Sequence, residues 1–182
     1  MPKPLVASIA LLTLCPLAAP VYAGSSVTVN KAHGWETSSV QRVAVVVTEC
    51  SGSVNCDVVQ GSVAAAAARL WKTVPRQKVA EGLFQLGEAE YSEEMRQPLI
   101  EALSTEERPV DAILEVSVPH AKHGGGPFTD RRSEAVLKVV LRRKDGTVLM
   151  VGTGRGRPLN VVSGPERVLR KLGEDIFRKA FP

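Results

Sequence analysis

The sequence predicts an α/β domain in which three helices pack on a mixed β-sheet of about four to five strands. Three observations lead to this fold class. The β-branched run VAVVVT at residues 43–48 is typical of a strand covered on both faces. Segments of helical period alternate with apolar runs of strand length along the chain. Asp145-Gly146 lies between two strand-like runs and predicts a hairpin, so the sheet should contain antiparallel as well as parallel pairs.

The amino terminus predicts export. Residues 1–23 contain one lysine, then an apolar region, then small residues around Ala23, which is the pattern of a secretory signal peptide cleaved after that alanine. In a lipoprotein Cys15 would be acylated, but Leu14 precedes it where a lipobox needs a small side chain, so lipidation is not expected. No later apolar run is long enough to span a membrane. Removing 23 of 182 residues leaves 159, so we expect a periplasmic protein of one domain.

Two cysteines, Cys50 and Cys56, remain after the signal peptide, and they predict a disulfide. A zinc site would need four ligands, and no second ligand pair lies at a suitable spacing. A thioredoxin-like redox motif has two residues between its cysteines, whereas five separate these. A metal clamp and a redox pair are therefore the less favoured alternatives. The small loop that the disulfide closes would stabilise the fold by about 2 to 3 kcal/mol.

The first half of the mature chain predicts an arm, a strand and a helix. Residues 24–41 are polar and without period, so we expect a flexible amino-terminal arm outside a single α/β domain at 42–182. After the strand at 43–48, Asp57 predicts the cap of an alanine-rich helix over 58–74.

The middle of the chain predicts less regular elements. Residues 78–92 favour a weak strand, because two glycines interrupt the apolar side chains there. Ser92 then caps a helix through MRQPLIEAL, residues 95–103. The apolar run at 111–118 predicts a second central strand. Residues 119–132, with three consecutive glycines and two prolines, predict a mobile loop.

The segment EAVLKVVLRRKDGTVLMVGTG predicts the hairpin, with a two-residue turn of positive backbone angles at Asp145-Gly146. This register pairs Leu141 with Met150, Val139 with Gly152, and Leu137 with Gly154. Because glycines opposite large residues leave space, we expect a helix to lie close over this face.

The last element is an amphipathic helix. Its start is marked by Ser163 with Glu166 three residues later, a capping box with Pro165 in the first turn. The apolar residues that follow at helical spacing are Val168, Leu169, Leu172, Ile176 and Phe177.

In their order, these pieces resemble a group of bacterial envelope proteins that includes the amino-terminal domain of TolB, CsgG and LpoB. The resemblance rests on RVAVVVTE, LFQLGEAEYSEEMRQPLIEAL, VDAILEVSV, the hairpin, and PERVLRKLGEDIFRKAF, so it covers most of residues 42–182. It lies in pattern and order, without a diagnostic motif. The resemblance implies a TolB amino-terminal-like fold and a non-enzymatic scaffold that binds envelope partners. Unlike CsgG and LpoB, this chain lacks a lipobox, and its first strand leads into Glu49-Cys50 where that group tends to have Pro-Phe.

Two motifs invite a ligand and are better explained without one. His120 and His123 flank Lys122, but a metal needs further donors, so two solvated histidines are the simpler interpretation. GTGRGRP at 152–158 is similar to a phosphate-binding loop, but it follows a hairpin strand and no helix starts directly after it. We therefore expect no metal, nucleotide or other cofactor.

The serine hydroxyls and carboxylates of the sequence do not indicate a specific catalytic activity either. No GxSxG motif is present, and neither Ser117 nor Ser163 has a base nearby in the sequence. Four carboxylates lie close together, Glu88, Glu90, Glu93 and Glu94, and a solvated helix start is the usual meaning of such a run.

The charge distribution is more informative. Residues 24–118 hold 8 Lys and Arg against 13 Asp and Glu, whereas residues 119–182 hold 14 against 6. The basic residues on or beside the hairpin predict a partner-binding surface: Arg131, Arg132, Arg142, Arg143, Lys144, Arg155 and Arg157. The alternative is ordinary surface charge paired with the acidic half. Export and an aromatic content of only 4% disfavour nucleic acid.

The favoured function is that of a non-catalytic periplasmic accessory protein that binds an envelope protein or an anionic envelope polymer. The alternative is a small periplasmic hydrolase of peptidoglycan or polysaccharide, in which His120 or the carboxylates between 88 and 94 supply acid–base chemistry. A third possibility is a structural protein that self-assembles through the hairpin edge. The sequence predicts neither the partner nor the oligomeric state.

Overall fold

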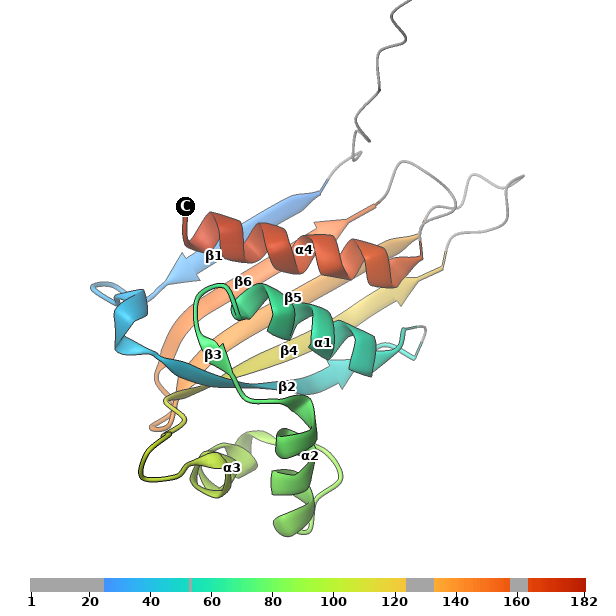
Figure 1. Cartoon of the computed structure of the whole chain (residues 1–182). Helices are drawn as coiled ribbons and strands as arrows, with labels where there is room; N and C mark the ends of the chain where they lie inside the picture. Colours follow the sequence, from blue (N-terminus) through green and yellow to red (C-terminus); the bar gives the residue numbers. More distant parts are fainter. Residues whose placement is uncertain (1–24, 53, 124–132, 158–163) are drawn as a thin grey trace, which may run out of the picture.

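The structure, a computed structural model, describes residues 25–52, 54–123, 133–157 and 164–182 (Figure 1). The predicted signal peptide with Cys15, the glycine-rich part of the predicted loop, Arg131, Arg132 and Ser163 lie outside the described residues.

Six strands form one mixed sheet in the order β1-β6-β5-β4-β2-β3. The strands are β1 (Ser26–Lys31), β2 (Arg42–Cys50), β3 (Lys72–Thr73), β4 (Ala112–Lys122), β5 (Glu134–Arg143) and β6 (Val148–Gly156). β2 is parallel to β3 and β4, and the other pairs are antiparallel. The helices are α1 (Cys56–Ala67), α2 (Arg76–Gln85), α3 (Arg96–Leu103) and α4 (Pro165–Ala180), with short 3-10 turns at η1 (Thr37–Ser39) and η2 (Glu93–Met95).

The α/β class and the mixed sheet are confirmed, but the predicted four to five strands and three helices are too few: the described residues form six strands and four α-helices. Helices α1 and α4 cover one face of the sheet and enclose the main hydrophobic core. Helices α2 and α3 pack on the other face, mainly against β2 and β4, around a second core that includes Ile113 and Leu99 (Figure 1).

The prediction of a strand within residues 78–92 is wrong, because Arg76–Gln85 is helix α2. Val79 and Leu83 lie on one face of that helix and pack into the second core, which is the pairing of positions i and i+4 on a helix. Gly82 is tolerated at this contact because α3 comes close: a Cβ there would lie 3.1 Å from side-chain atoms of Leu99 and Leu103.

The prediction of a flexible arm at 24–41 is also wrong for most of the segment. Ser26–Lys31 is the edge strand β1, which pairs with β6 from Ser26 opposite Arg155 to Lys31 opposite Met150. Val27 and Val29 pack against the main core. Only two apolar side chains alternate here, so the sequence signal for a strand is weak, and a distant partner strand completes it.

Helix α1 begins two residues before the predicted start, at Cys56, and ends earlier than predicted. Asn55, not Asp57, is its cap, and the Asn55 side chain accepts hydrogen bonds from the backbone N–H groups of Asp57 and Val58. The helix ends at Ala67 rather than continuing to residue 74, because the chain turns there and Lys72–Thr73 pairs with β2 as strand β3.

The predicted hairpin register is confirmed at all three pairs, although the turn differs. Arg143 N–H donates to Thr147 C=O, so three residues form the turn, and only Gly146 has a positive φ, at 90°. The extra turn residue is offset by a bulge, since Leu141 pairs with Met150 while Arg142 pairs with Val148. The strand register is therefore as predicted, although the turn contains one residue more than predicted.

Helix α4 buries all five predicted apolar residues. Its cap residue is Gly164, one residue after the predicted Ser163. Three glycines of β6 lie beneath it, as expected for Gly152 and Gly154, and a Cβ at Gly152 would be 2.4 Å from Ile176 Cγ2. The helix therefore approaches the sheet more closely than any side chain at these positions would allow.

Candidate functional site

One face of the sheet is only partly covered by helices. We call the face opposite α1 and α4, outside the area under α2 and α3, the open face. Cross-strand pairing places one polar row across five strands of it: Thr28, Thr153, Lys138, Ser117 and Glu49. All of these are exposed except half-buried Ser117, whose hydroxyl donates to Glu49 Oε2 at 2.9 Å. The row offers hydroxyl, ammonium and carboxylate groups to a binding partner.

Three of the predicted basic residues, Arg142, Arg155 and Arg157, lie on the open face, and each is already paired. Arg142 Nε donates to Glu115 Oε2 at 2.9 Å. Arg155 and Arg157 both bind Glu134, at 2.5 and 2.6 Å. Hydrogen bonding from Arg157, and then from Arg155, lowers the pKa of Glu134 below its usual value.

The remaining described members of the predicted basic surface, Arg143 and Lys144, lie at the hairpin turn. Arg143 Nη2 donates to Ser39 Oγ at 3.1 Å, and Lys144 Nζ is 3.9 Å from Glu101 Oε1. They are roughly 20 Å along the strands from Arg155, from the strand rise per residue. The predicted residues therefore do not form one continuous patch.

Sequence reasoning missed two lysines of the open face, Lys122 and Lys138. Both are exposed and face away from the core, because their neighbours Ala121, Leu137 and Val139 are buried in it. Strand alternation was the signal that could have found them. Among the described residues, the open face carries five basic side chains against three carboxylates: Lys122, Lys138, Arg142, Arg155 and Arg157 against Glu49, Glu115 and Glu134.

A buried polar chain connects the open face to the α2–α3 layer. Tyr91 Oη donates to Glu115 Oε1 at 3.0 Å, while Arg142 binds the other oxygen of the same carboxylate. Burial, together with the Glu115 carboxylate, raises the pKa of the Tyr91 phenol above its usual value. This arrangement fixes Arg142 in a structural role, so its charge is not available to a partner.

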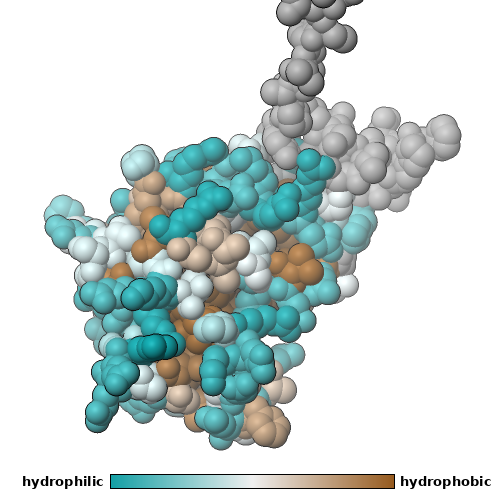
Figure 2. All heavy atoms as spheres, viewed as in Figure 1, coloured by the Kyte–Doolittle hydropathy of each residue, from teal (hydrophilic) through white to brown (hydrophobic). Residues whose placement is uncertain are grey.

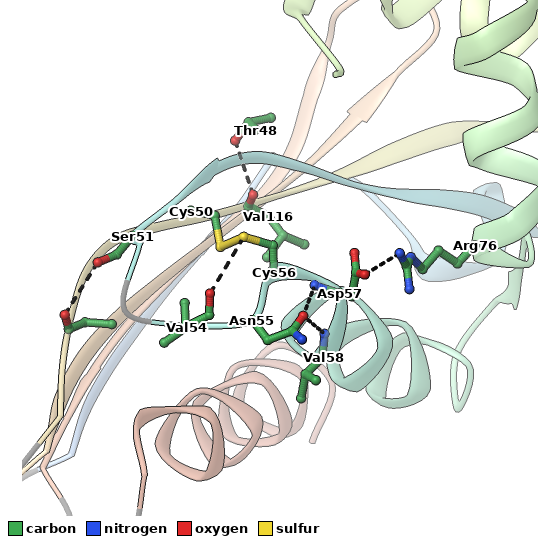
Figure 3. Close-up of a disulfide and its surroundings, with 11 residues drawn as sticks. Thr48, Cys50, Ser51, Val54, Asn55, Cys56, Asp57, Val58, Arg76 and Val116 are labelled. Atoms are coloured by element: carbon green, nitrogen blue, oxygen red, sulfur yellow. Dashed lines mark hydrogen bonds and ion pairs between the residues drawn. A yellow bond between two sulfur atoms is a disulfide. The ribbon is translucent and has the colours of Figure 1, made fainter. Parts of the chain in front are cut away.

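A cavity lies beside the end of β2, and we call it the β2–α2 cleft. It has a volume of about 780 Å³ and is lined by residues 46–50 of β2, the start of α1, helix α2 and residues 88–91. The predicted disulfide between Cys50 and Cys56 is present and forms one end of it (Figure 3). Beside the disulfide, Asp57 of α1 and Arg76 of α2 form an ion pair at 2.5 Å across the cleft.

The cleft brings together part of the predicted acidic cluster. Glu88 and Glu90 line it together with Glu49, whereas Glu93 pairs with Arg96 at 3.1 Å outside it. His120 is not part of the cleft: it lies on β4 opposite Val136, on the open face. Within the described part of the chain, no group of three or more His, Cys, Asp or Glu side chains is placed to hold a metal ion.

The described residues contain no helix that is both long and apolar enough to cross a membrane. No protein-family model matches the chain, and no curated protein matches its sequence.

Solved structures do match the fold. A PelC dodecamer from Paraburkholderia phytofirmans superposes with a TM-score of 0.54 at 11% identity, over 84% of this chain and 94% of that one. A leucine-to-methionine variant of the same PelC gives a TM-score of 0.56 at 11% identity, over 84% and 95%. Lipoprotein GNA1162 from Neisseria meningitidis gives 0.51 at 15% identity, over 77% and 96%. At these identities the likeness shows a shared fold, and the narrower resemblance to TolB, CsgG and LpoB stays a prediction.

Proposed function

We propose that this chain is an exported, non-catalytic accessory protein of the bacterial envelope that acts by binding a partner through its open face. The observation that carries the proposal is the polar row across five strands, from Thr28 to Glu49, which no helix of the described chain covers. Antiparallel sheets commonly pack one face on the core and leave the other face to solvent, where a partner can bind. Paired charges beside exposed hydroxyls are typical of polar interfaces.

The likeness to a bacterial lipoprotein and to a protein that forms a dodecamer supports an envelope role and an assembly role. The partner is an envelope protein or an anionic envelope polymer. Lys122 and Lys138, for which no ion pair is found among the described residues, favour a partner with acidic or hydroxyl groups.

The test is affinity capture with residues 24–182 from solubilised envelope of the bacterium that makes the protein, read by mass spectrometry at low and moderate salt. A double variant, Lys138→Glu with Thr153→Glu, changes the centre of the row without touching the buried Glu115 network. The control is Arg167→Glu with Arg170→Glu, two exposed positions on α4 whose reversal makes a slightly larger charge change away from the open face.

We expect a salt-sensitive partner that the open-face variant loses and the α4 variant retains. If both variants capture the partner equally well, the open face is not the binding surface. If no partner is captured even under cross-linking, the proposed binding role is contradicted. Reversal of Arg142 is not a clean test, because it would unpair buried Glu115 and destabilise the fold.

A second candidate function is hydrolysis of peptidoglycan or polysaccharide, because Glu49, Glu88 and Glu90 surround one cleft. Two carboxylates flanking a substrate can act as acid and base in glycoside hydrolysis. Purified residues 24–182 should then release soluble fragments from peptidoglycan, and Glu88→Gln with Glu90→Gln should abolish the release. Absence of release from peptidoglycan and from envelope polysaccharide would exclude this function.

A further inference from the structure

Strand β2 has an outer edge that lacks a partner strand over most of its length. On that side β3 pairs only with Arg42 and Val43, and the last backbone bond is donated by Val74 N–H to Val43 C=O at 2.9 Å. Pro75 follows, which has no N–H to continue the ladder and begins helix α2. In the described part of the chain no strand takes over beyond Val43.

The open part of this edge lies along the β2–α2 cleft. Because alternate residues of a strand point their backbone groups to opposite edges, Val45 and Val47 face the same way as Val43. The Val45 carbonyl accepts a hydrogen bond from Gln60 Nε2 at 2.6 Å, so a side chain already takes the place of a strand there. Val47 is half-buried and lines the cleft, and strand alternation directs its N–H and C=O toward an incoming backbone there.

The walls of the cleft combine apolar surface with negative charge. Val79 and Leu83 of α2 line the cleft, and Phe84 at its mouth is 83% exposed, more than any other large hydrophobic side chain of the described residues. On the face of the molecule seen in Figure 2, hydrophobic residues reach the surface in places among hydrophilic ones. With Val79 and Leu83 inside the cleft, Phe84 extends apolar surface that polar residues border, which is the arrangement that marks interaction sites.

The charge of the rim is not balanced. Asp57 is neutralised by Arg76, but no ion pair to Glu49, Glu88 or Glu90 is found among the described residues. Three carboxylates around an apolar groove attract a ligand that carries positive charge between apolar groups.

We propose that the β2–α2 cleft binds an extended, basic segment of a partner protein, which adds to the outer edge of β2 as a further strand. Its backbone pairs with Val47, its apolar side chains meet Leu83 and Phe84, and its lysines or arginines meet Glu88 and Glu90. Strand addition of this kind takes affinity from backbone hydrogen bonds and specificity from alternate side chains. The site goes beyond the proposed function: it adjoins the polar row of the open face at Glu49, but its contacts with Val47, Leu83, Phe84, Glu88 and Glu90 do not depend on that row.

The probe is a fluorescent, amidated octapeptide of alternating lysine and valine, tested against residues 24–182 by anisotropy at 50 mM NaCl. Three peptides separate the contributions: the lysine–valine peptide, its glutamate–valine counterpart, and a lysine–valine peptide with alternate backbone nitrogens methylated. We expect only the first to bind. Binding of the methylated peptide with equal affinity would overturn strand addition, because charge alone would then explain it.

Two double variants test the location. Glu88→Lys with Glu90→Lys should weaken binding about fivefold or more, the size expected for losing two exposed charge pairs. Glu106→Lys with Glu107→Lys makes the same charge change in the turn at residues 105–108, away from the cleft, and should weaken binding less than twofold. Equal weakening in both would overturn the site.

Amide exchange read by NMR identifies the edge directly. The Val47 amide should exchange fast in the free protein and become protected when the lysine–valine peptide binds, and Phe84→Ala should reduce that protection. Binding without protection at Val47, or no binding of the peptide at all, would overturn the proposal. Neither result would affect the open-face test, which uses variants outside the cleft, at Lys138 and Thr153, and a different readout.

Discussion

At the scale of single residues, Gly152 sets how closely α4 approaches the sheet. An added Cβ would lie 2.4 Å from Ile176 Cγ2 and 3.0 Å from Val139 Cγ2, so Gly152→Ala should lower the free energy of unfolding by about 1 to 3 kcal/mol through overpacking. Urea unfolding measures this loss.

The matched control for that prediction is Gly61→Ala. Gly61 is exposed within α1, and nothing lies within 4 Å of its added Cβ. Alanine should therefore raise the free energy of unfolding, by about 0.5 to 1 kcal/mol, because it loses less backbone entropy in a helix. A similar loss for both variants would contradict the close approach of α4.

Tyr91 is the other residue with a measurable signature, because it is the only tyrosine in residues 24–182. Burial and Glu115 raise its pKa above the usual 10.0, so the folded protein should show no phenolate absorbance near 295 nm at pH 11. An unfolded tyrosine ionises above pH 10, so the free energy of unfolding should fall as the pH rises above 10. As the pH is raised, the phenolate absorbance should therefore appear at the same pH at which the protein unfolds.

Tyr91→Phe is the control for this titration. The variant should remove the phenolate absorbance and the fall in the free energy of unfolding above pH 10. It should lower the free energy of unfolding by about 1 to 3 kcal/mol at neutral pH, because Glu115 loses its buried donor. A phenol that ionises near pH 10 in a still-folded protein would contradict the buried pair.

At the scale of elements, β1 makes residues 24–41 part of the domain. Trp35 lies in the same segment, with its ring centroid 6.5 Å from that of Trp71 and 5.8 Å from that of Phe181. Deletion of 24–41 should lower the free energy of unfolding by at least about 3 kcal/mol, from the buried apolar area it removes.

Two measurements accompany the deletion. Tryptophan fluorescence should shift to longer wavelength, because Trp71, now 3% exposed, loses its neighbour. Deletion of residues 24 and 25 alone, which precede the strand, should change neither property. Unchanged stability in the longer deletion would restore the prediction of a flexible arm.

At the scale of the whole molecule, the two helical layers should differ in stability. Helices α1 and α4 share the large core with five strands, whereas α2 and α3 enclose a smaller core on β2 and β4. Native-state hydrogen exchange should therefore show the α2 and α3 amides opening at a lower free energy than those of β4 and β5. A single opening free energy for both layers would contradict two separable units.

The sequence predicted those features that depend on local periodicity. The register of the hairpin followed from the two-residue repeat of strands and stayed correct although the turn gained a residue, because a bulge beside Leu141 absorbed the difference. The buried face of α4 followed from its helical repeat. By contrast, residues 78–85 are compatible locally with strand or helix, and contact with Leu99 of α3 selects the helix.

The candidate site was less predictable, because it depends on which elements become neighbours. The basic residues were identified as a group, but Glu134 and Glu115, distant in sequence, pair with three of them. Lys138 was overlooked although strand alternation assigns it to the exposed face. The acidic residues 88 and 90 were identified, but their cleft exists only because β3 ends early.

The sequence by itself determined the α/β class, the two central strands, the hairpin register, the apolar face of the last helix and the pairing of Cys50 with Cys56, since each follows from local repeats or from the number of cysteines. The tertiary structure alone decided that residues 26–31 complete the sheet, that α2 is a helix, and that one sheet face and one strand edge stay open. Those outcomes depend on long-range pairing, and the free energy that selects them comes from surfaces buried between distant segments.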